Sequence, residues 1–302
     1  MAQKTSAPPH DVTIREVGPR DGLQAEAPLP VEARVAIIEA LVGAGVRQIE
    51  AVAFVSPRAV PSMAGAAEVL QALERVPGVT YWALVPNLKG AELALEAGVD
   101  GLSLTVSASE TYSQKNVHMS VEESATEAGR IAELAAGRVP VDAVVSFAFG
   151  SPYEGDFEPA TVAALGRRLA EGGATSLTYA DTTGMATPRR VTDLLASTGH
   201  EVGLHLHETR GTALVSAYAA LEAGVNRFDT SIGGLGGSPF AAGAAGNLAT
   251  EDLVHLLDDL GVATGIDLEA LLDVSASVAT AIGHPVPSRV AAAGPRWRRA
   301  ER

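Results

Sequence analysis

Continuous apolar runs that predict buried strands alternate along the chain with runs whose apolar spacing predicts helices. Four segments repeat one form, in which a helical run ends at small residues that include glycine and a short apolar strand follows. They are residues 43–52 (GAGVRQIEAV), 96–105 (EAGVDGLSLT), 171–180 (EGGATSLTYA) and 222–231 (EAGVNRFDTS). Glycine just past a helix end supplies the left-handed residue that closes a helix, so each segment predicts a helix-to-strand junction.

Further strands are expected between these copies. The copies lie about 50–75 residues apart, whereas a strand with its crossover helix needs only about 30 residues. Candidate strands precede the first copy and fill each gap, at residues 11–17 (DVTIREV), 80–86 (TYWALVP), 141–149 (VDAVVSFAF) and 201–207 (EVGLHLH). Helical runs are expected at residues 31–42, 59–75, 121–136, 159–171, 188–197 and 209–222, and after the last strand at 251–260 and 268–282.

Eight strands alternating with helices predict an α/β fold, a single (β/α)8 TIM barrel with extra C-terminal helices. A doubly wound sheet is the alternative, and it is disfavoured because no G-x-G-x-x-G opens a helix after the first strand. The expected boundaries are a disordered N-terminal tail over residues 1–10, one catalytic barrel over 11–285 and a C-terminal tail over 286–302.

Composition narrows the class of protein. The 302 residues carry 22 Lys and Arg against 36 Asp and Glu, a net charge of −14, which argues against nucleic-acid or anionic-membrane partners. The absence of cysteine excludes disulfides, thiolate metal sites and a cysteine nucleophile. The N-terminus lacks the apolar stretch of a signal peptide, and no run approaches the roughly 18 apolar residues of a membrane span. We therefore expect a cytoplasmic protein.

The candidate functional residues are the polar ones at the carboxyl ends of the predicted strands, where TIM barrels carry their chemistry. His205 and His207 are the sharpest signal, because residues i and i+2 of a strand point to the same face. They predict either a metal site or two hydrogen-bonded core histidines. Asp21 and Asn247 follow other strands and favour the metal, and such a nitrogen and oxygen set without thiolate suits Mg²⁺ or Mn²⁺.

A second candidate pair is Glu50 and Arg20. Glu50 lies within an apolar strand, where a carboxylate is costly unless paired, and Arg20 is the natural partner. The pair is either a structural ion pair or a device that turns the guanidinium toward the site. Glu16 is expected to support the metal or Arg20. Asp181 and Asn87 are either helix caps or ligand contacts.

The segment of residues 233–247 contains six glycines in fifteen residues. It is either a mobile lid over the substrate or a flexible connector. It is not a phosphate-binding Walker loop, because G-x-x-x-x-G-K-[ST] is absent.

These residues, in this order, resemble the 3-hydroxy-3-methylglutaryl-CoA lyase family of TIM-barrel metallolyases. The resemblance covers residues 10–280 or so and rests on long blocks rather than on an isolated H-x-H. The blocks include residues 16–24 (EVGPRDGLQ), 54–57 (FVSP), 86–90 (PNLKG), 151–155 (SPYEG), 181–184 (DTTG), 233–246 and 246–253 (GNLATEDL).

The resemblance implies a divalent metal held by Asp21, His205, His207 and Asn247, and an acyl-CoA substrate. It implies retro-Claisen cleavage of a 3-hydroxyacyl-CoA to acetyl-CoA and a keto acid, by a possible homodimer. Arg20, held by Glu50, would stabilise the enolate, and His205 would transfer a proton. The substrate contacts it implies are Asn87, Tyr153, Asp181, Gly236 and Gly237.

The chain departs from the family pattern at Ser238, Glu208, Arg210 and Ala53, and the first two are candidate site residues. Ser238 stands where the family carries a catalytic cysteine, and an alcohol is a far weaker acid than a thiol, whose pKa is about 8.5. Glu208 replaces the aspartate that follows the second histidine and is expected to alter the surroundings of the metal ligands. Two alternatives therefore stay open: a Claisen-condensing or aldolase relative with the same metal–enolate chemistry, and an impaired barrel that binds metal or acyl-CoA without turnover.

Overall fold

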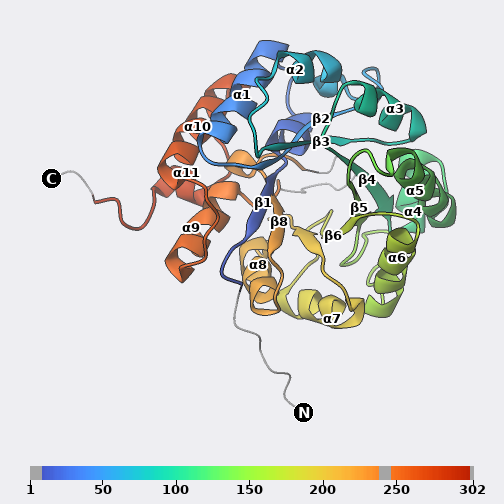
Figure 1. The fold of residues 1–302 in the computed structure, drawn as a ribbon. Coiled ribbons are helices and arrows are strands. Elements are labelled where there is room, and N and C mark those ends of the chain that lie inside the picture. Colours follow the sequence, from blue (N-terminus) through green and yellow to red (C-terminus); the bar gives the residue numbers. More distant parts are fainter. Residues whose placement is uncertain (1–8, 238–245, 300–302) are drawn as a thin grey trace.

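Eight parallel strands close into a barrel in the computed structural model, which describes residues 9–237 and 246–299 (Figure 1). Each strand pairs with its neighbours in sequence, and the last pairs with the first. The strands are β1 (Thr13–Glu16), β2 (Gln48–Ala53), β3 (Thr80–Leu84), β4 (Gly101–Ser107), β5 (Val141–Ser146), β6 (Ser176–Ala180), β7 (Gly203–His205) and β8 (Arg227–Thr230). The predicted TIM barrel is confirmed, and each strand overlaps a segment expected to contain one.

Helices between the strands surround the barrel (Figure 1). They are α1 (Val31–Gly43), α2 (Ala66–Ala72), α3 (Leu88–Glu96), α4 (Glu110–Val117), α5 (Val121–Ala135), α6 (Pro159–Glu171), α7 (Pro188–Thr198) and α8 (Ala213–Glu222). The extra C-terminal helices are also present, as α9 (Thr250–Leu260), α10 (Leu268–Ile282) and α11 (Arg289–Ala293). Of these, α10 packs against α1, and α11 packs against α9.

Local sequence explains where these helices begin. The Asn87 side chain caps α3 by accepting a hydrogen bond from Gly90 N at 2.9 Å. Helix α5 starts with a capping box, in which Ser120 and Glu123 each accept from the other's backbone N–H. Such caps satisfy backbone donors that have no partner within the helix.

Three segments differ from the expected boundaries. Residues 59–75 form a short 3₁₀ turn, η2 (Pro61–Met63), and then α2, because Gly65 adopts a left-handed φ of 76° between them. Helix α8 starts at Ala213, beyond Gly211 with its φ of 70°. The ordered structure also extends into the segment assigned to a C-terminal tail, since Ser288 Oγ and Val290 N both donate to Asp252 Oδ1 at 2.8 Å.

The interior of the barrel contains a polar layer. TIM barrels fill their interior with layers of four side chains from alternate strands, most often Val, Ile or Leu. Here Glu50, Ser103, Thr178 and Asp229 lie on β2, β4, β6 and β8, and all are at most 4% exposed. They occupy the same position in the four repeated segments. Each repeat therefore contributes one buried polar group to the centre of the barrel.

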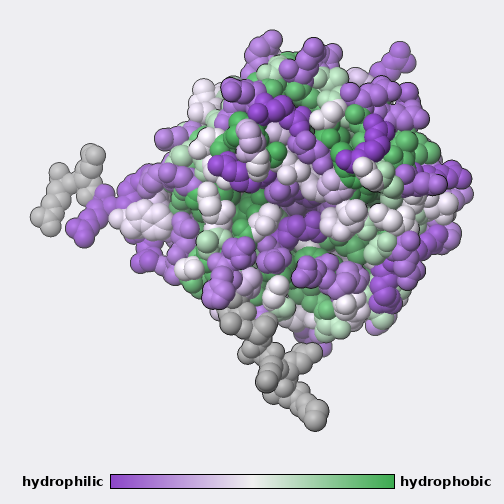
Figure 2. All heavy atoms as spheres, viewed as in Figure 1, coloured by the Kyte–Doolittle hydropathy of each residue, from purple (hydrophilic) through white to green (hydrophobic). Residues whose placement is uncertain are grey.

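On the face of the molecule that Figure 2 shows, hydrophilic residues cover most of the surface and hydrophobic residues lie in patches between them. None of the helices within residues 9–237 and 246–299 is long and apolar enough to cross a membrane.

Candidate metal centre and active site

The turn after β1 brings Arg20 and Asp21 to the mouth of the barrel. It is a turn of π-helix, η1 (Gly18–Gly22), in which Gly22 N donates to Val17 O at 3.3 Å. A Cβ on Gly18 would lie 2.6 Å from Glu16 Oε1, so glycine is required for this close packing. π-Helical turns are rare and occur frequently at functional sites.

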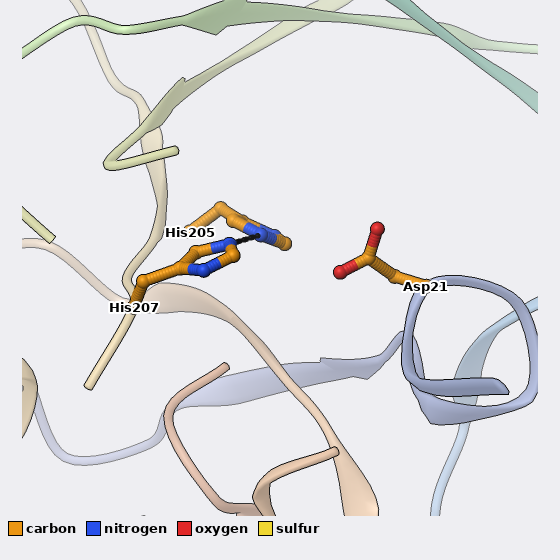
Figure 3. Close-up of side chains that lie close together, drawn as sticks. All are labelled: Asp21, His205 and His207. Atoms are coloured by element: carbon orange, nitrogen blue, oxygen red, sulfur yellow. Dashed lines mark hydrogen bonds between the residues drawn. The ribbon is translucent and has the colours of Figure 1, made fainter. Parts of the chain in front are cut away.

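Three of the predicted ligands converge at this mouth. Single ligand atoms of Asp21, His205 and His207 all lie within 4.8 Å of one another. Figure 3 shows Asp21 facing the two imidazoles, whose Nε2 atoms are 3.1 Å apart. That spacing is close to the roughly 3 Å between two adjacent ligand atoms around an octahedral ion with bonds of about 2.1 Å. Both histidines are buried, so few water molecules compete for these atoms.

Asn247 supplies a fourth donor that fits a metal. An isolated β-bridge to His207 holds it beside the histidines. Its Nδ2 donates to Asp21 Oδ2 at 2.7 Å and to Leu235 O at 2.9 Å, which fixes the orientation of the amide. Its Oδ1 is buried and has no hydrogen-bond partner. A buried acceptor without a partner is costly, and a cation would satisfy it, so the four residues fit a divalent ion.

Arg20 is held between two carboxylates. Its guanidinium pairs with Glu50 Oε2, and its Nη1 donates to Asp21 Oδ1 at 2.6 Å. Ser103 Oγ donates to the other oxygen of Glu50. Glu50 is 1% exposed and Arg20 retains 12% exposure, so the pair is anchored in the barrel and the cation reaches the mouth.

These neighbours set the charge states of the ligands. Burial by itself raises the pKa of Asp21, but the charges of Arg20, His205 and His207 and the hydrogen bond from Asn247 outweigh it and lower that pKa to about 2. Asp21 is therefore a carboxylate at neutral pH.

The surroundings of His205 raise its pKa instead of lowering it. Burial lowers its pKa, but the hydrogen bond to Asp229 and the charges of Asp21 and Asp229 outweigh burial and raise it. The imidazole thus lies among carboxylates that favour a proton on the ring while no cation is bound.

Glu16 lies behind the site and holds two loops together. Its Oε1 accepts from Gly18 N at 2.7 Å and from Ile232 N at 2.8 Å, and its Oε2 accepts from Thr250 Oγ1 at 2.5 Å. Burial raises its pKa to about 7, although all three hydrogen bonds lower it. Glu251 binds the adjacent Gly233 N, and burial raises the pKa of Glu251 to about 8. The two carboxylates fix the start of the glycine-rich segment.

Asp181 is another predicted residue whose surroundings suit it to a chemical role. Its Oδ1 accepts from Met185 N at 2.6 Å and Ala186 N at 3.0 Å, whereas its Oδ2 is buried and has no partner. Burial raises its pKa to about 6, against the lowering effect of those hydrogen bonds. One oxygen is therefore structural and the other is available.

The remaining predicted contacts are placed less tightly. Asn87 is exposed and caps α3, and Tyr153 is 37% exposed with Lys115 Nζ 4.2 Å from its ring centroid. Gly236 packs against Asn247, because a Cβ there would lie 2.6 Å from Asn247 Nδ2. Gly237 is at the edge of the described residues, with a φ of 149°.

Glu208 does not take part in the described centre. Ser238 lies outside the described residues. The carboxylate of Glu208 turns toward α8, where its Oε2 accepts from Ala213 N at 3.0 Å. Arg210 donates to the carbonyl oxygens of Thr183 and Gly184, at 2.6 Å and 3.1 Å.

Sequence reasoning missed the buried residues that support the site. Ser103 bonds Glu50, and Asp229 lies 3.4 Å from His205 Nδ1. Arg15 and Asp142 lie behind Asp229 within the barrel. A signal was available for two of these residues, since Ser103 and Asp229 match the position of Glu50 in the repeated segments.

Comparison with known proteins agrees with this geometry. A family model described as HMGL-like matches residues 11–278. Mitochondrial hydroxymethylglutaryl-CoA lyase of Rattus norvegicus is 42% identical over 292 residues, which cover 94% of this chain and 90% of the relative. The 3-hydroxy-3-isohexenylglutaryl-CoA/hydroxymethylglutaryl-CoA lyase of Pseudomonas aeruginosa is 41% identical over 292 residues, with 94% and 97% covered.

The fold agrees as well. The crystal structure of hydroxymethylglutaryl-CoA lyase from Pseudomonas aeruginosa superposes with a TM-score of 0.92 at 41% identity, covering 95% of this chain and 98% of that one. The convergent ligands, the barrel and these relatives together show that the chain belongs to the HMGL-like family of carbon–carbon lyases.

Proposed function

We propose that this protein is a divalent-metal-dependent lyase that cleaves 3-hydroxy-3-methylglutaryl-CoA, or a close 3-hydroxyacyl-CoA, into acetyl-CoA and a keto acid. The observation that carries the proposal is the convergence of Asp21, His205, His207 and the unpartnered Asn247 Oδ1 beside Arg20. The names of the relatives supply the substrate class.

The four ligands would hold Mg²⁺ or Mn²⁺, for which a nitrogen and oxygen donor set is suited. Bound there, the ion would polarise the 3-hydroxyl of the substrate and lower its pKa. Asp21 contributes a fixed negative charge, because its pKa of about 2 keeps it ionised at any physiological pH.

The reaction removes one proton from the 3-hydroxyl of the substrate and later returns one proton to C2. A base removes the proton of the 3-hydroxyl, the C2–C3 bond breaks as the ketone forms, and the electron pair passes into the thioester as an enolate. A proton delivered to C2 then gives acetyl-CoA. Asp181 Oδ2 is the group at the mouth suited to exchange these protons, since it is buried without a partner and the pKa of Asp181 is about 6. His205 is assigned to the metal instead, because its Nδ1 faces Asp229 and its Nε2 faces the metal centre.

Arg20 is suited to stabilise the enolate oxygen. Its contacts with Glu50 and Asp21 leave N–H groups on Nη1 and Nη2 for the substrate, and they hold the guanidinium in place before the charge develops. Donors fixed in advance near a developing oxyanion are usually the largest single contribution to such a reaction.

Ser238 is proposed to hydrogen-bond the substrate or to position a water molecule, in place of the thiol that the resemblance implies. We also propose a cytoplasmic homodimer.

The test is acetyl-CoA release from 3-hydroxy-3-methylglutaryl-CoA with Mg²⁺ or Mn²⁺, before and after chelation. We expect chelation to abolish release, and the Asp21→Ala and His207→Ala variants to lose it. Asp193→Ala, on the exposed face of α7, is the matched control and should keep full activity. Condensation of acetyl-CoA with a keto acid, without release, would instead identify a condensing enzyme. Metal and CoA binding without either reaction would identify an impaired barrel.

A further inference from the structure

Asp229 adjoins the metal-ligand histidine through the strand register. On β7 and β8, His205 pairs with Asp229, and on β8 and β1, Asp229 pairs with Arg15. Residues paired in register on neighbouring parallel strands point to the same side of the sheet. The three side chains therefore lie next to one another inside the barrel, and each is at most 8% exposed.

Arg15 fixes the plane of the Asp229 carboxylate. Its Nε donates to Asp229 Oδ1 at 2.8 Å, and its Nη2 donates to Asp229 Oδ2 at 2.7 Å. This two-pronged contact leaves Oδ2 directed at His205 Nδ1, 3.4 Å away. A guanidinium that donates to both oxygens of a carboxylate fixes its orientation more firmly than a single hydrogen bond does.

A second carboxylate holds Arg15 from the far side. Arg15 Nη2 donates to Asp142 Oδ2 at 2.8 Å, and Asp142 also accepts from Ser176 and Thr178 hydroxyls and from Arg227 Nη1 at 3.1 Å. Two guanidiniums thus balance two carboxylates. The network is neutral by itself, so it does not require a positive charge on His205.

We propose that Asp229, oriented by Arg15 and Asp142, is a positioning residue that accepts the Nδ1–H of His205 and turns an unprotonated Nε2 toward the metal centre. The inference rests on the metal centre of the proposed function. A histidine binds a metal ion through a ring nitrogen that carries no proton, and the hydrogen bond at the other nitrogen selects that tautomer. The Nε2 atoms of His205 and His207 are also within hydrogen-bond distance of each other, at 3.1 Å. With the proton on Nδ1, His205 Nε2 is the acceptor in this contact, whereas the other tautomer makes it the donor and leaves it no lone pair for a metal ion.

Asp229→Asn tests this arrangement with almost no change in shape. Asparagine has one oxygen for the two Arg15 donors, so an amide N–H that takes the place of Oδ2 faces His205 Nδ1. The ring then accepts at Nδ1 and carries its proton on Nε2. We expect the tautomer to switch, and the affinity for Mn²⁺ to fall by about 10- to 100-fold, as for other residues that orient metal ligands.

The tautomer is measured by nitrogen NMR of ¹⁵N-histidine-labelled, metal-free protein at a pH high enough to keep the His205 ring neutral, with a His205→Gln spectrum to assign the signal. Mn²⁺ affinity is measured by titration calorimetry without substrate. Glu251→Gln is the control, because it makes the same carboxyl-to-amide change at a buried side chain, which contacts the glycine-rich segment rather than a histidine. It should leave the His205 tautomer unchanged.

If Asp229→Asn fails to fold, Asp142→Asn replaces it. That variant leaves Asp229 in place but loosens Arg15, and we expect a Mn²⁺ affinity about 3- to 10-fold weaker. The proposal is overturned if folded Asp229→Asn keeps the wild-type tautomer, or if its Mn²⁺ affinity stays within about twofold of the wild type. Because the tautomer is read without metal or substrate, a wild-type protein without lyase activity would refute the proposed function, while the NMR measurement would still decide this inference.

Discussion

Replacing Glu16 with glutamine should make the protein more stable at pH 8 than the wild type. Glu16 is fully buried, and its pKa is raised from 4.5 to about 7, chiefly by burial. Between those values the folded protein binds a proton that the unfolded chain has released, so the wild type loses stability as the pH rises through this window. At 1.36 kcal/mol per pKa unit, the loss amounts to about 3 kcal/mol and is complete above pH 7.

Glutamine can keep every contact of Glu16. Its oxygen can accept from Gly18 N and Ile232 N, and its amide can donate to Thr250 Oγ1. Thr250 can then donate to Thr230 Oγ1, 2.7 Å away. The variant therefore removes the cost of the buried charge without leaving a polar atom unpaired.

The measurement is the free energy of unfolding in urea at several values between pH 4 and pH 8, by circular dichroism, with chelator present so that metal binding adds no pH dependence. The difference between Glu16→Gln and the wild type should be small at pH 4 and grow to about 3 kcal/mol by pH 8. Glu92→Gln, at an exposed position of α3, should show a flat difference. A flat difference for Glu16→Gln as well would refute the reasoning, because it would mean that Glu16 is ionised at no cost.

Three further predictions concern the mouth of the barrel. Gly236→Ala should weaken Mn²⁺ binding at least tenfold in calorimetry. The Cβ of the alanine would lie 2.6 Å from Asn247 Nδ2, and the backbone at this position has a φ of 110°. An unchanged affinity would show that the loop relaxes freely. Arg20→Lys should lower kcat for acetyl-CoA release about 100-fold while KM changes little, because lysine cannot contact Glu50 and Asp21 at the same time. A rise in KM alone would assign Arg20 to substrate binding. Ser238→Cys should raise kcat on 3-hydroxy-3-methylglutaryl-CoA, because a thiol exchanges protons near neutral pH; a flat result would show that the alcohol does not limit turnover.

The barrel was predictable because its evidence is local and repeated. Every strand after the first follows a helix end marked by glycine or polar residues, and eight strands connected in this way leave few arrangements. Helix α4 was not foreseen because its residues are mostly polar and only Ser113 is buried, so it shows no apolar periodicity. Its start is held by Ser109, whose hydroxyl accepts from Tyr112 N and donates to Glu154 of a distant loop. A contact of that range is invisible in a local pattern.

Of the metal centre, only the residues at or after the ends of strands could be predicted from the sequence. Asp21, His205, His207 and Asn247 follow strands, and the topology of the barrel alone brings such residues together. Arg15 and Asp142, which support the site, could not be predicted in this way. Both lie within strands, where a charged side chain points either into the barrel or toward a covering helix. Register and shear decide between the two, and the sequence of one strand contains neither.

The charged centre of the barrel also restricts how this sequence can change. Arg15 and Asp142 are 127 positions apart in the chain, yet each is an ion-pair partner of the other in a space that excludes water. Arg15 also pairs with Asp229, and Asp142 also pairs with Arg227. A neutral replacement of Arg15 or Asp142 therefore leaves this network of two guanidiniums and two carboxylates with one unbalanced buried charge, at a cost of several kcal/mol. Substitutions here are therefore tolerated in compensating sets, so β1, β5 and β8 must diverge together although no local motif links them.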